Sequence, residues 1–206
     1  AILAVMWHYR TTLARMVRHS FVRGPEQRLT LNVIVAFLPA AVLGFLLIDL
    51  IKAHLFTTGV VAWALVIGGL VMLWLEWRRP VTTAADLCDV RWTQALVIGL
   101  AQCLAMVPGT SRAAATILGG YAAGLSRPAA TGFSFLLAIP TIVGAAALDL
   151  WQSRDLFTRA DLPFFGLGTL VAFGSALLVI RGFLRFVEHH SFVGFAWYRI
   201  GFGGVL

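Results

Sequence analysis

Long apolar stretches separated by short polar connections dominate this sequence. Leu29–Leu50 contains 22 residues, which as a helix at ~1.5 Å per residue is about 33 Å long, enough to cross a hydrocarbon core of about 30 Å. Similar runs occupy Gly59–Trp77, Ala129–Leu150, Leu162–Phe183 and Ser191–Leu206. The pattern predicts about five transmembrane helices, or six if Ala1–Tyr9, too short to span alone, is the end of another. We therefore expect an all-α polytopic membrane protein that forms one integral membrane domain over residues 1–206.

The segment Gln94–Leu125 departs from this pattern. Pro108-Gly109 divides it into two apolar pieces of about 14 and 13 residues, each about 20 Å long and too short to cross a bilayer. Proline ends a helix and glycine allows a sharp turn, so we predict a re-entrant hairpin of two half-helices over residues 94–125. The Gly120-x-x-x-Gly124 spacing should let the second half-helix pack closely against a neighbour.

The distribution of Lys and Arg indicates an orientation. If the hairpin returns to the side from which it entered, eleven basic residues lie on one side of the membrane and three on the other. A hairpin that crossed completely would leave eight against six. The positive-inside rule favours the first layout, with the richer side in the cytoplasm. That side contains Arg10, Arg15, Arg18, Arg23, Arg28, Arg78, Arg79, Arg91, Arg127, Arg181 and Arg185, and the other contains Lys52, Arg154 and Arg159.

Composition excludes an ordinary soluble domain. Sixty per cent of the residues are hydrophobic and 12% are charged, against roughly 25% charged in a typical soluble domain. The net charge of +7 is spread over short connections, so we expect anionic lipid headgroups and not nucleic acid as electrostatic partners. Cys88 and Cys103 lack the close pairing of a metal site.

Two arginines, Arg112 and Arg199, lie inside apolar segments. An arginine at the centre of a membrane helix costs about 2.5 to 3.5 kcal/mol, so it should face an anion or a wet cavity. For Arg199 the alternative of reaching toward the membrane surface stays equally open. Thr110 and Ser111 precede a helix-forming run at N-cap positions, where free N–H groups and Arg112 would converge on one small volume. This grouping suits a phosphate, although we expect Thr110 to be mainly a cap.

One class of membrane phosphatase does not fit. Phosphatidate-type enzymes use S-R-x-x-x-x-x-H with a catalytic histidine, whereas Leu118 stands six residues after Arg112. The histidines lie at or beyond predicted span ends, so none is an evident general base: His8, His19, His54, His189 and His190.

Three stretches, taken together and in this order, resemble the undecaprenyl-diphosphate phosphatases of the bacterial inner membrane, also called bacitracin-resistance proteins. They are Pro39-Ala40-Ala41-Val42-Leu43-Gly44; Ile98-Gly99-Leu100-Ala101-Gln102-Cys103-Leu104-Ala105 with Pro108-Gly109-Thr110-Ser111-Arg112 and Thr116; and Phe133-Ser134-Phe135-Leu136-Leu137-Ala138-Ile139-Pro140. The similarity covers almost the whole chain. Ala113 departs from the family, which usually has serine there, and this argues against an essential hydroxyl at that position.

The resemblance implies an inverted-repeat architecture and hydrolysis of undecaprenyl diphosphate to undecaprenyl phosphate plus phosphate, which recycles the lipid carrier for cell-wall synthesis. It implies that Ser111 and Arg112 are catalytic, with Ser111 as nucleophile or phosphate ligand. It implies that the substrate-binding residues are Gly109, Thr110, Thr116 and Gln102. The family's first motif, roughly E-G-x-x-E-x-x-P-x-S-S-x-G-H, is not in this chain. We expect it before Ala1, together with the ligands of a divalent cation, Mg²⁺ or Ca²⁺, and interpret the chain as truncated at its N-terminus.

Other functions remain open. Paired broken helices also build midplane sites in transporters, so a lipid-phosphate carrier or transporter without hydrolytic activity is one alternative. An inactive, incomplete homologue is another. The phosphatase hypothesis implies a polyprenyl diphosphate substrate, contact with membrane lipids and a multi-pass location in the bacterial inner membrane, and it leaves a homo-oligomer open. No residue of this chain is assigned as a metal ligand.

Overall fold

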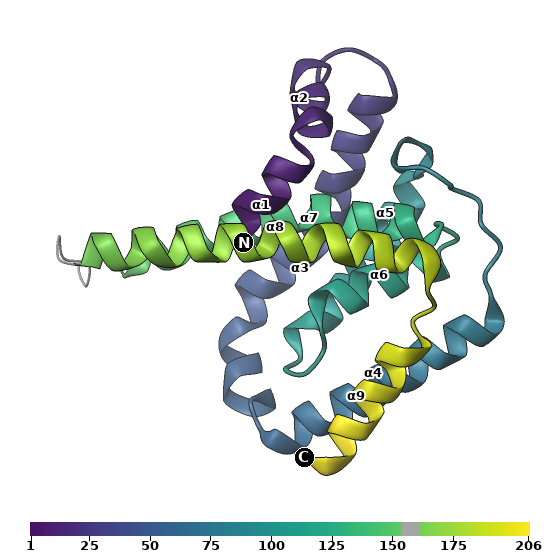
Figure 1. Ribbon diagram of the computed structural model, residues 1–206, viewed down its shortest axis with the longest axis vertical. Coiled ribbons are helices and arrows are strands. Elements are labelled where there is room, and N and C mark those ends of the chain that lie inside the picture. The colour runs from purple at the N-terminus through teal and green to yellow at the C-terminus, as the bar shows by residue number, and fades with distance from the viewer. Residues whose placement is uncertain (154–160) are drawn as a thin grey trace.

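The computed structural model describes residues 1–153 and 161–206, and its regular elements there are all helices (Figure 1). In chain order they are α1 Ile2–His8, α2 Arg10–Arg18, α3 Pro25–Leu55, α4 Thr58–Arg78, the 3₁₀ turn η1 Leu87–Asp89, α5 Trp92–Cys103, the 3₁₀ turn η2 Leu104–Met106, α6 Arg112–Ala122, α7 Arg127–Gln152, α8 Leu162–His189 and α9 Val193–Val205. The expected all-α fold is confirmed. Arg154 and Arg159, two basic residues of the predicted orientation, lie outside the described residues.

Four helices in the described ranges are long and apolar enough to cross a membrane: α3, α4, α7 and α8. They cover the first four predicted spans. The fifth, Ser191–Leu206, differs, because α9 contains 13 residues and is therefore about 20 Å long, too short to cross alone. It packs instead along α4, where the two helices run side by side (Figure 1).

Small residues allow the helices to approach closely. A Cβ atom at Gly99 of α5 would lie 2.5 Å from the carbonyl oxygen of Ala36 in α3, and one at Gly69 of α4 would lie 2.8 Å from that of Ala196 in α9. Such contacts matter in lipid, where water does not drive apolar helices together. Gly120 meets the Ala130 side chain of α7 as the sequence predicted. Gly124 differs, since its φ of +90° makes it a turn residue.

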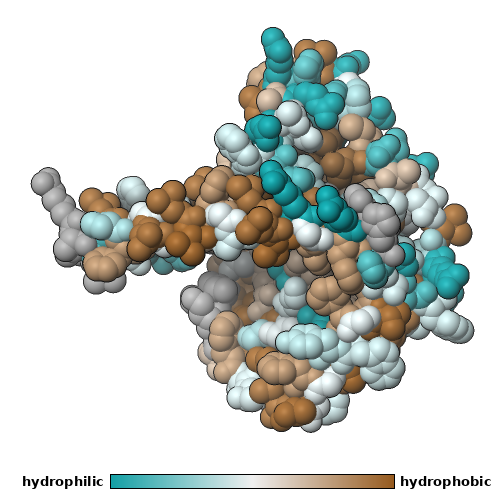
Figure 2. Space-filling view, viewed as in Figure 1, coloured by the Kyte–Doolittle hydropathy of each residue, from teal (hydrophilic) through white to brown (hydrophobic). Residues whose placement is uncertain are grey.

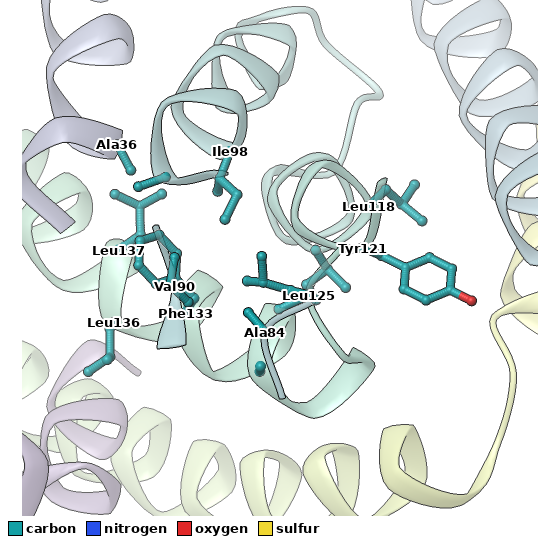
Figure 3. Packing of buried hydrophobic residues seen from close by; sticks show 14 of the residues in the cluster. Ala36, Ala84, Val90, Ile98, Leu118, Tyr121, Leu125, Phe133, Leu136 and Leu137 are labelled. Atoms are coloured by element: carbon teal, nitrogen blue, oxygen red, sulfur yellow. The ribbon is translucent and has the colours of Figure 1, made fainter. Parts of the chain in front are cut away.

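The core lies where α5, α6 and α7 meet. Ile98 of α5 and Phe133 and Leu137 of α7 are fully buried, and Figure 3 shows them pointing into one cluster with Leu125. Tyr121 of α6 belongs to the same cluster, although its ring points away from Phe133 in Figure 3. This packing holds the two short helices against longer ones, α5 against α3, and α6 against α7 and α4.

One end of the molecule is polar and tied together. The carboxylate of Glu76, near the end of α4, accepts from Arg127 Nη2 at the start of α7 (2.5 Å) and from the backbone N–H of Phe192 between α8 and α9 (2.9 Å). Asn32 of α3 donates to the carbonyl of Val90 (2.6 Å). The segments predicted on the cytoplasmic side therefore share one end, and hydrophilic residues gather toward α2 and the start of α3 there (Figure 2).

The opposite halves of α7 and α8 form a projecting arm (Figure 1) whose surface is mostly apolar in Figure 2. Its large side chains are exposed, among them Leu148, Phe164, Leu167, Leu170 and Leu178. Exposed apolar helices of this length are suited to contact with lipid tails. The chain is a multi-pass membrane protein.

Candidate active site

The predicted hairpin consists of two short antiparallel helices, α5 and α6. A Cβ atom on Gly119 would lie 2.6 Å from the Ala101 side chain, and Gln94 Nε2 donates to the carbonyl of Ala123 (2.9 Å). With 12 and 11 residues, the helices are each about 17 Å long and cannot cross a bilayer. The chain thus leaves the hairpin beside its point of entry, as a re-entrant segment must.

Hydrogen bonds close the base of the hairpin. Gln94 donates to Thr83 Oγ1 (3.0 Å) as well as to Ala123, and its Oε1 accepts from the backbone N–H of Arg91 (2.9 Å). Ser126 donates from Oγ to the carbonyl of Ala85 (2.8 Å). The polar groups of Gln94 are therefore used in holding the chain together.

The tip of the hairpin is the loop 107–111. The backbone N–H of Thr110 donates to the carbonyl of Val107 (3.1 Å), which closes a tight turn around Gly109. Gly109 has a φ of +85°, and a Cβ there would lie 2.7 Å from the carbonyl oxygen of Val61 in α4. Both the conformation and the contact require glycine, so the loop backbone lies directly against α4.

Ser111, not Thr110, caps α6. Its Oγ accepts from the backbone N–H of Ala114 (3.3 Å), whereas the Thr110 hydroxyl has no hydrogen bond to the described residues. The expectation that Thr110 is mainly a cap is wrong, because the first helical residue is Arg112 and the cap position falls one residue later. Ser111 is exposed and keeps its own hydroxyl proton available as a donor.

Arg112 carries an unused donor. Its Nη1 is buried and has no hydrogen-bond partner among the described residues, and no carboxylate there forms an ion pair with it. Arg127 at the other end of the hairpin is paired with Glu76. A structural ion pair, the alternative explanation for Arg112, is therefore not found in the part of the chain that the structure describes.

Arg199 belongs to the same region, and the sequence alone left its role open. It is 7% exposed, and its Nη2 donates to the carbonyls of Ala64 in α4 (3.2 Å) and of Gly109 in the tip (3.1 Å). It does not reach toward a membrane surface. Its position inside an apolar run was the available signal, but only the packing of α9 on α4 brings it to the loop.

A cavity of about 280 Å³ opens beside the tip. Ser111 and Arg199 supply its polar groups, and most of the remaining lining is apolar: Leu65, Met72, Ala113, Ala114, Ile117, Leu118, Phe183, Phe192, Phe195 and Tyr198. A larger cavity of about 680 Å³ lies at the polar end of the molecule, around Glu76, Arg79 and Arg127. The smaller cavity is the one next to the predicted chemistry, and its walls suit a lipid tail.

Two predicted substrate contacts lie elsewhere. Thr116 is fully buried, and its Oγ1 shares a 2.6 Å hydrogen bond with Ser134 Oγ of α7 and donates to the carbonyl of Arg112 (2.9 Å). Its hydroxyl thus joins α6 to α7. Gln102 is 3% exposed, and both polar atoms of its amide lack a partner among the described residues. Neither residue lines the cavity, and of the predicted site residues only Ser111 does, since Gly109, Thr110 and Arg112 are not part of its lining.

Among the described residues, no histidine lines the cavity at the tip. The rings of His19, His54 and His190 each lie within hydrogen-bonding distance of a carbonyl of their own helix. Within residues 1–153 and 161–206 no three His, Cys, Asp or Glu side chains form a group that could hold a metal ion. The described residues at the tip therefore do not fit a divalent cation, which prefers several oxygen ligands including carboxylates.

Known proteins have sequences similar to this chain. The family model described as bacitracin resistance protein BacA matches residues 1–205. "Undecaprenyl-diphosphatase" of Pseudomonas aeruginosa (strain UCBPP-PA14) is 52% identical over 203 residues, which are 98% of this chain and 73% of that protein.

Two further relatives agree. "Undecaprenyl-diphosphatase 1" of Pseudomonas fluorescens (strain Pf0-1) is 50% identical over 206 residues, 100% of this chain and 75% of that protein. "Undecaprenyl-diphosphatase" of Nitrosospira multiformis is 51% identical over 203 residues, 98% and 74% of the two chains. On the strength of the family match and of these identities, the chain belongs to the bacitracin resistance protein BacA family.

Proposed function

We propose that this protein hydrolyses undecaprenyl diphosphate to undecaprenyl phosphate and inorganic phosphate. The observation that carries the proposal is the tip of the hairpin, where Arg112 keeps a buried, unpartnered N–H donor and the preceding residue, Ser111, keeps an exposed hydroxyl. The names of relatives at about half identity over the whole chain support the same reaction.

The charge at the tip favours a phosphate group. An unpaired guanidinium in an apolar setting is costly, and an incoming anion offsets that cost. The planar fork of Arg112 matches two phosphate oxygens, and the N-terminus of α6 offers further N–H groups. The apolar cavity that begins at Ser111 suits the hydrocarbon tail attached to such a group. Phosphate recognition and tail binding thus meet at one residue.

The chemistry follows from these groups. An oxygen nucleophile attacks the terminal phosphorus while the bond between that phosphorus and the bridging oxygen breaks, and undecaprenyl phosphate leaves. Arg112 donates to the phosphoryl oxygens and stabilises the charge of the transition state. Ser111 acts as a phosphate ligand through its free proton, because its oxygen already accepts from Ala114 and no base lies beside it among the residues described. Water is the nucleophile in this scheme, and the proton that it loses passes to an oxygen of the phosphate that is released.

The family match and the membrane-spanning helices support a location in the bacterial inner membrane. Membrane lipids and the polyprenyl diphosphate are then its partners. The activity would recycle the lipid carrier for cell-wall synthesis.

A divalent cation remains part of the proposal, with no ligand assigned to this chain. In the full-length product of the gene, chelation with EDTA should abolish phosphate release, and Mg²⁺ or Ca²⁺ should restore it. Full activity in EDTA would remove the cation from the proposal.

The decisive test is phosphate release from undecaprenyl diphosphate by the purified full-length protein in detergent, compared with a Ser111→Ala and Arg112→Lys double variant. Release that the double variant lacks supports hydrolysis at this site. Binding of the lipid without any release would support a lipid-phosphate carrier. Equal release by parent and variant would place the chemistry elsewhere.

A further inference from the structure

Arg199 of α9 reaches across α4 to the loop at the hairpin tip. Its Nη2 donates to the carbonyl of Ala64 (3.2 Å) and to that of Gly109 (3.1 Å). The guanidinium lies in a notch at Gly68, because a Cβ there would be 2.5 Å from Nη2 and 3.2 Å from Cζ. One side chain thus joins three elements that are far apart in the sequence.

The notch and the seat of the loop lie on one face of α4. Val61, which the backbone of Gly109 contacts, and Ala64 and Gly68 are spaced three and four residues apart, the spacing of neighbours on a helix face. The loop is therefore held against α4 by its own backbone contact and by the hydrogen bond from Arg199. Gly109 comes two residues before Ser111, so fixing its carbonyl fixes the start of α6.

The charge of Arg199 indicates a specific use. The residue is 7% exposed, its Nε is buried without a partner, and no carboxylate among the described residues pairs with it. A residue that served only to fill space between α9 and α4 could be apolar at lower cost. A guanidinium is suited to hold two carbonyl groups at fixed angles, since its donors lie in one plane.

We propose that Arg199 is a positioning residue, which holds the Gly109 carbonyl and so keeps Ser111 and Arg112 in the geometry that binds phosphate. This inference rests on the proposed function for its effect on catalysis, but not for its effect on the loop. A misplacement of about 1 Å can cost about 10²-fold in rate. Release of the loop should therefore lower turnover without removing any group that touches the substrate.

The test uses two independent ways to displace the guanidinium in the full-length protein. Arg199→Lys keeps the charge but loses the planar donors. Gly68→Ala fills the notch and so displaces the guanidinium without changing residue 199. Gly204→Ala is the control, because it is also a helix glycine but a Cβ there meets nothing within 4 Å. We expect the first two variants to lower kcat about 10- to 100-fold, with a smaller change in KM, and the control to match the parent.

Because both variants act on the same contact, the double variant should be little worse than Arg199→Lys alone. The melting temperature of each purified variant reports on folding. If Arg199→Lys does not fold, Gly68→Ala still tests the contact. Losses of kcat that merely follow losses of melting temperature, or that simply add in the double variant, would overturn the proposal.

A second readout does not depend on the reaction. A single cysteine at Thr110, in a protein without Cys88 and Cys103, reports on access to the loop through its rate of reaction with a water-soluble maleimide. Arg199→Lys and Gly68→Ala should raise that rate severalfold, and Gly204→Ala should not. Unchanged labelling overturns the positioning role even if kcat falls. If both variants label faster but the parent protein releases no phosphate, the positioning role of Arg199 stands and the proposed function is wrong.

Discussion

The two ends of the α5–α6 hairpin differ in whether the charge of their arginines is balanced by a carboxylate. At the base, Gln94 uses both atoms of its amide, and Arg127 forms an ion pair with Glu76, although its Nε is buried without a hydrogen-bond partner in the described residues. At the tip, Arg112 and Arg199 each keep a buried donor without a partner in the described residues, and Ser111 keeps a free proton. Both ends are built from arginine and short polar side chains, so residue type does not distinguish them.

This difference in charge balance distinguishes the end that holds the fold together from the end that can bind a ligand. Buried polar groups in native proteins are nearly all satisfied, and unsatisfied ones call for an explanation. At the base, the charge of Arg127 is already balanced by Glu76, so an anion would have to compete with that carboxylate. At the tip, the arginine donors have no carboxylate partner among the described residues and lie near an apolar cavity, so they are available to an anionic ligand.

Arg112→Lys should reduce turnover by about 10² or more, the scale of losing one preorganised donor to a developing charge. Lysine keeps the charge but not the two-point fork. The measurement is phosphate release from undecaprenyl diphosphate in detergent, with the melting temperature as the folding control. Turnover near that of the parent would make Arg112 a structural residue, like Arg127 at the base.

Glu76→Gln should lower stability and leave turnover nearly unchanged, the reverse of Arg112→Lys. It removes the charge that Arg127 and the Phe192 N–H share, so we expect a loss of about 1 to 3 kcal/mol in stability with turnover per folded molecule little changed. Thermal unfolding measures the first quantity, and phosphate release normalised to folded protein the second. A catalytic defect as large as that of Arg112→Lys, without a loss of stability, would erase the contrast between the two ends.

Thr110→Val should change turnover by less than about threefold, since the half-buried Thr110 hydroxyl neither caps α6 nor bonds to a described residue, and removing a hydroxyl without a bonded partner costs little. Ser111→Ala is the matched comparison, because it removes both the cap and the free proton. Equal defects in the two variants would mean that the whole loop, rather than Ser111, contacts the phosphate.

Labelling of single cysteines should show which side of the membrane each end of the molecule faces, without altering the fold. The native Cys88, in a Cys103→Ala variant, should react with a membrane-impermeant maleimide from the cytoplasmic side. A Ser153→Cys residue in a protein without native cysteines should react from the other side. Labelling of both from one side would contradict the re-entrant hairpin. Cys88 is preferable to Thr83, whose hydroxyl joins the hairpin base.

The pH of that experiment matters. Partial burial, followed by the Glu26 carboxylate, raises the pKa of the Cys88 thiol. The thiolate is the reactive form, so at neutral pH a smaller fraction of Cys88 reacts than of an unperturbed thiol. Its labelling rate should keep rising with pH beyond the usual thiol range. A rate that levels off at the same pH as that of a small free thiol measured in parallel would show that the pKa is not raised.

The membrane class, the four spanning helices and the divided hairpin could be predicted from the sequence. These depend on local properties: run length fixes whether a helix can cross, and Pro108-Gly109 ends one helix wherever it is placed. The sequence also singled out Ser111 and Arg112, since an arginine in an apolar segment needs an explanation that holds in any fold.

Only the tertiary structure decided which polar groups remain free. Thr116 and Gln102 were equal candidates in the sequence, yet packing against α7 gives Thr116 a partner in Ser134 and leaves Gln102 without one in the described ranges. Arg199 was undecided until α9, too short to span, packed on α4 and carried its guanidinium to Gly109. Partners 90 residues apart along the chain leave no local pattern, because their meeting depends on how helices pack.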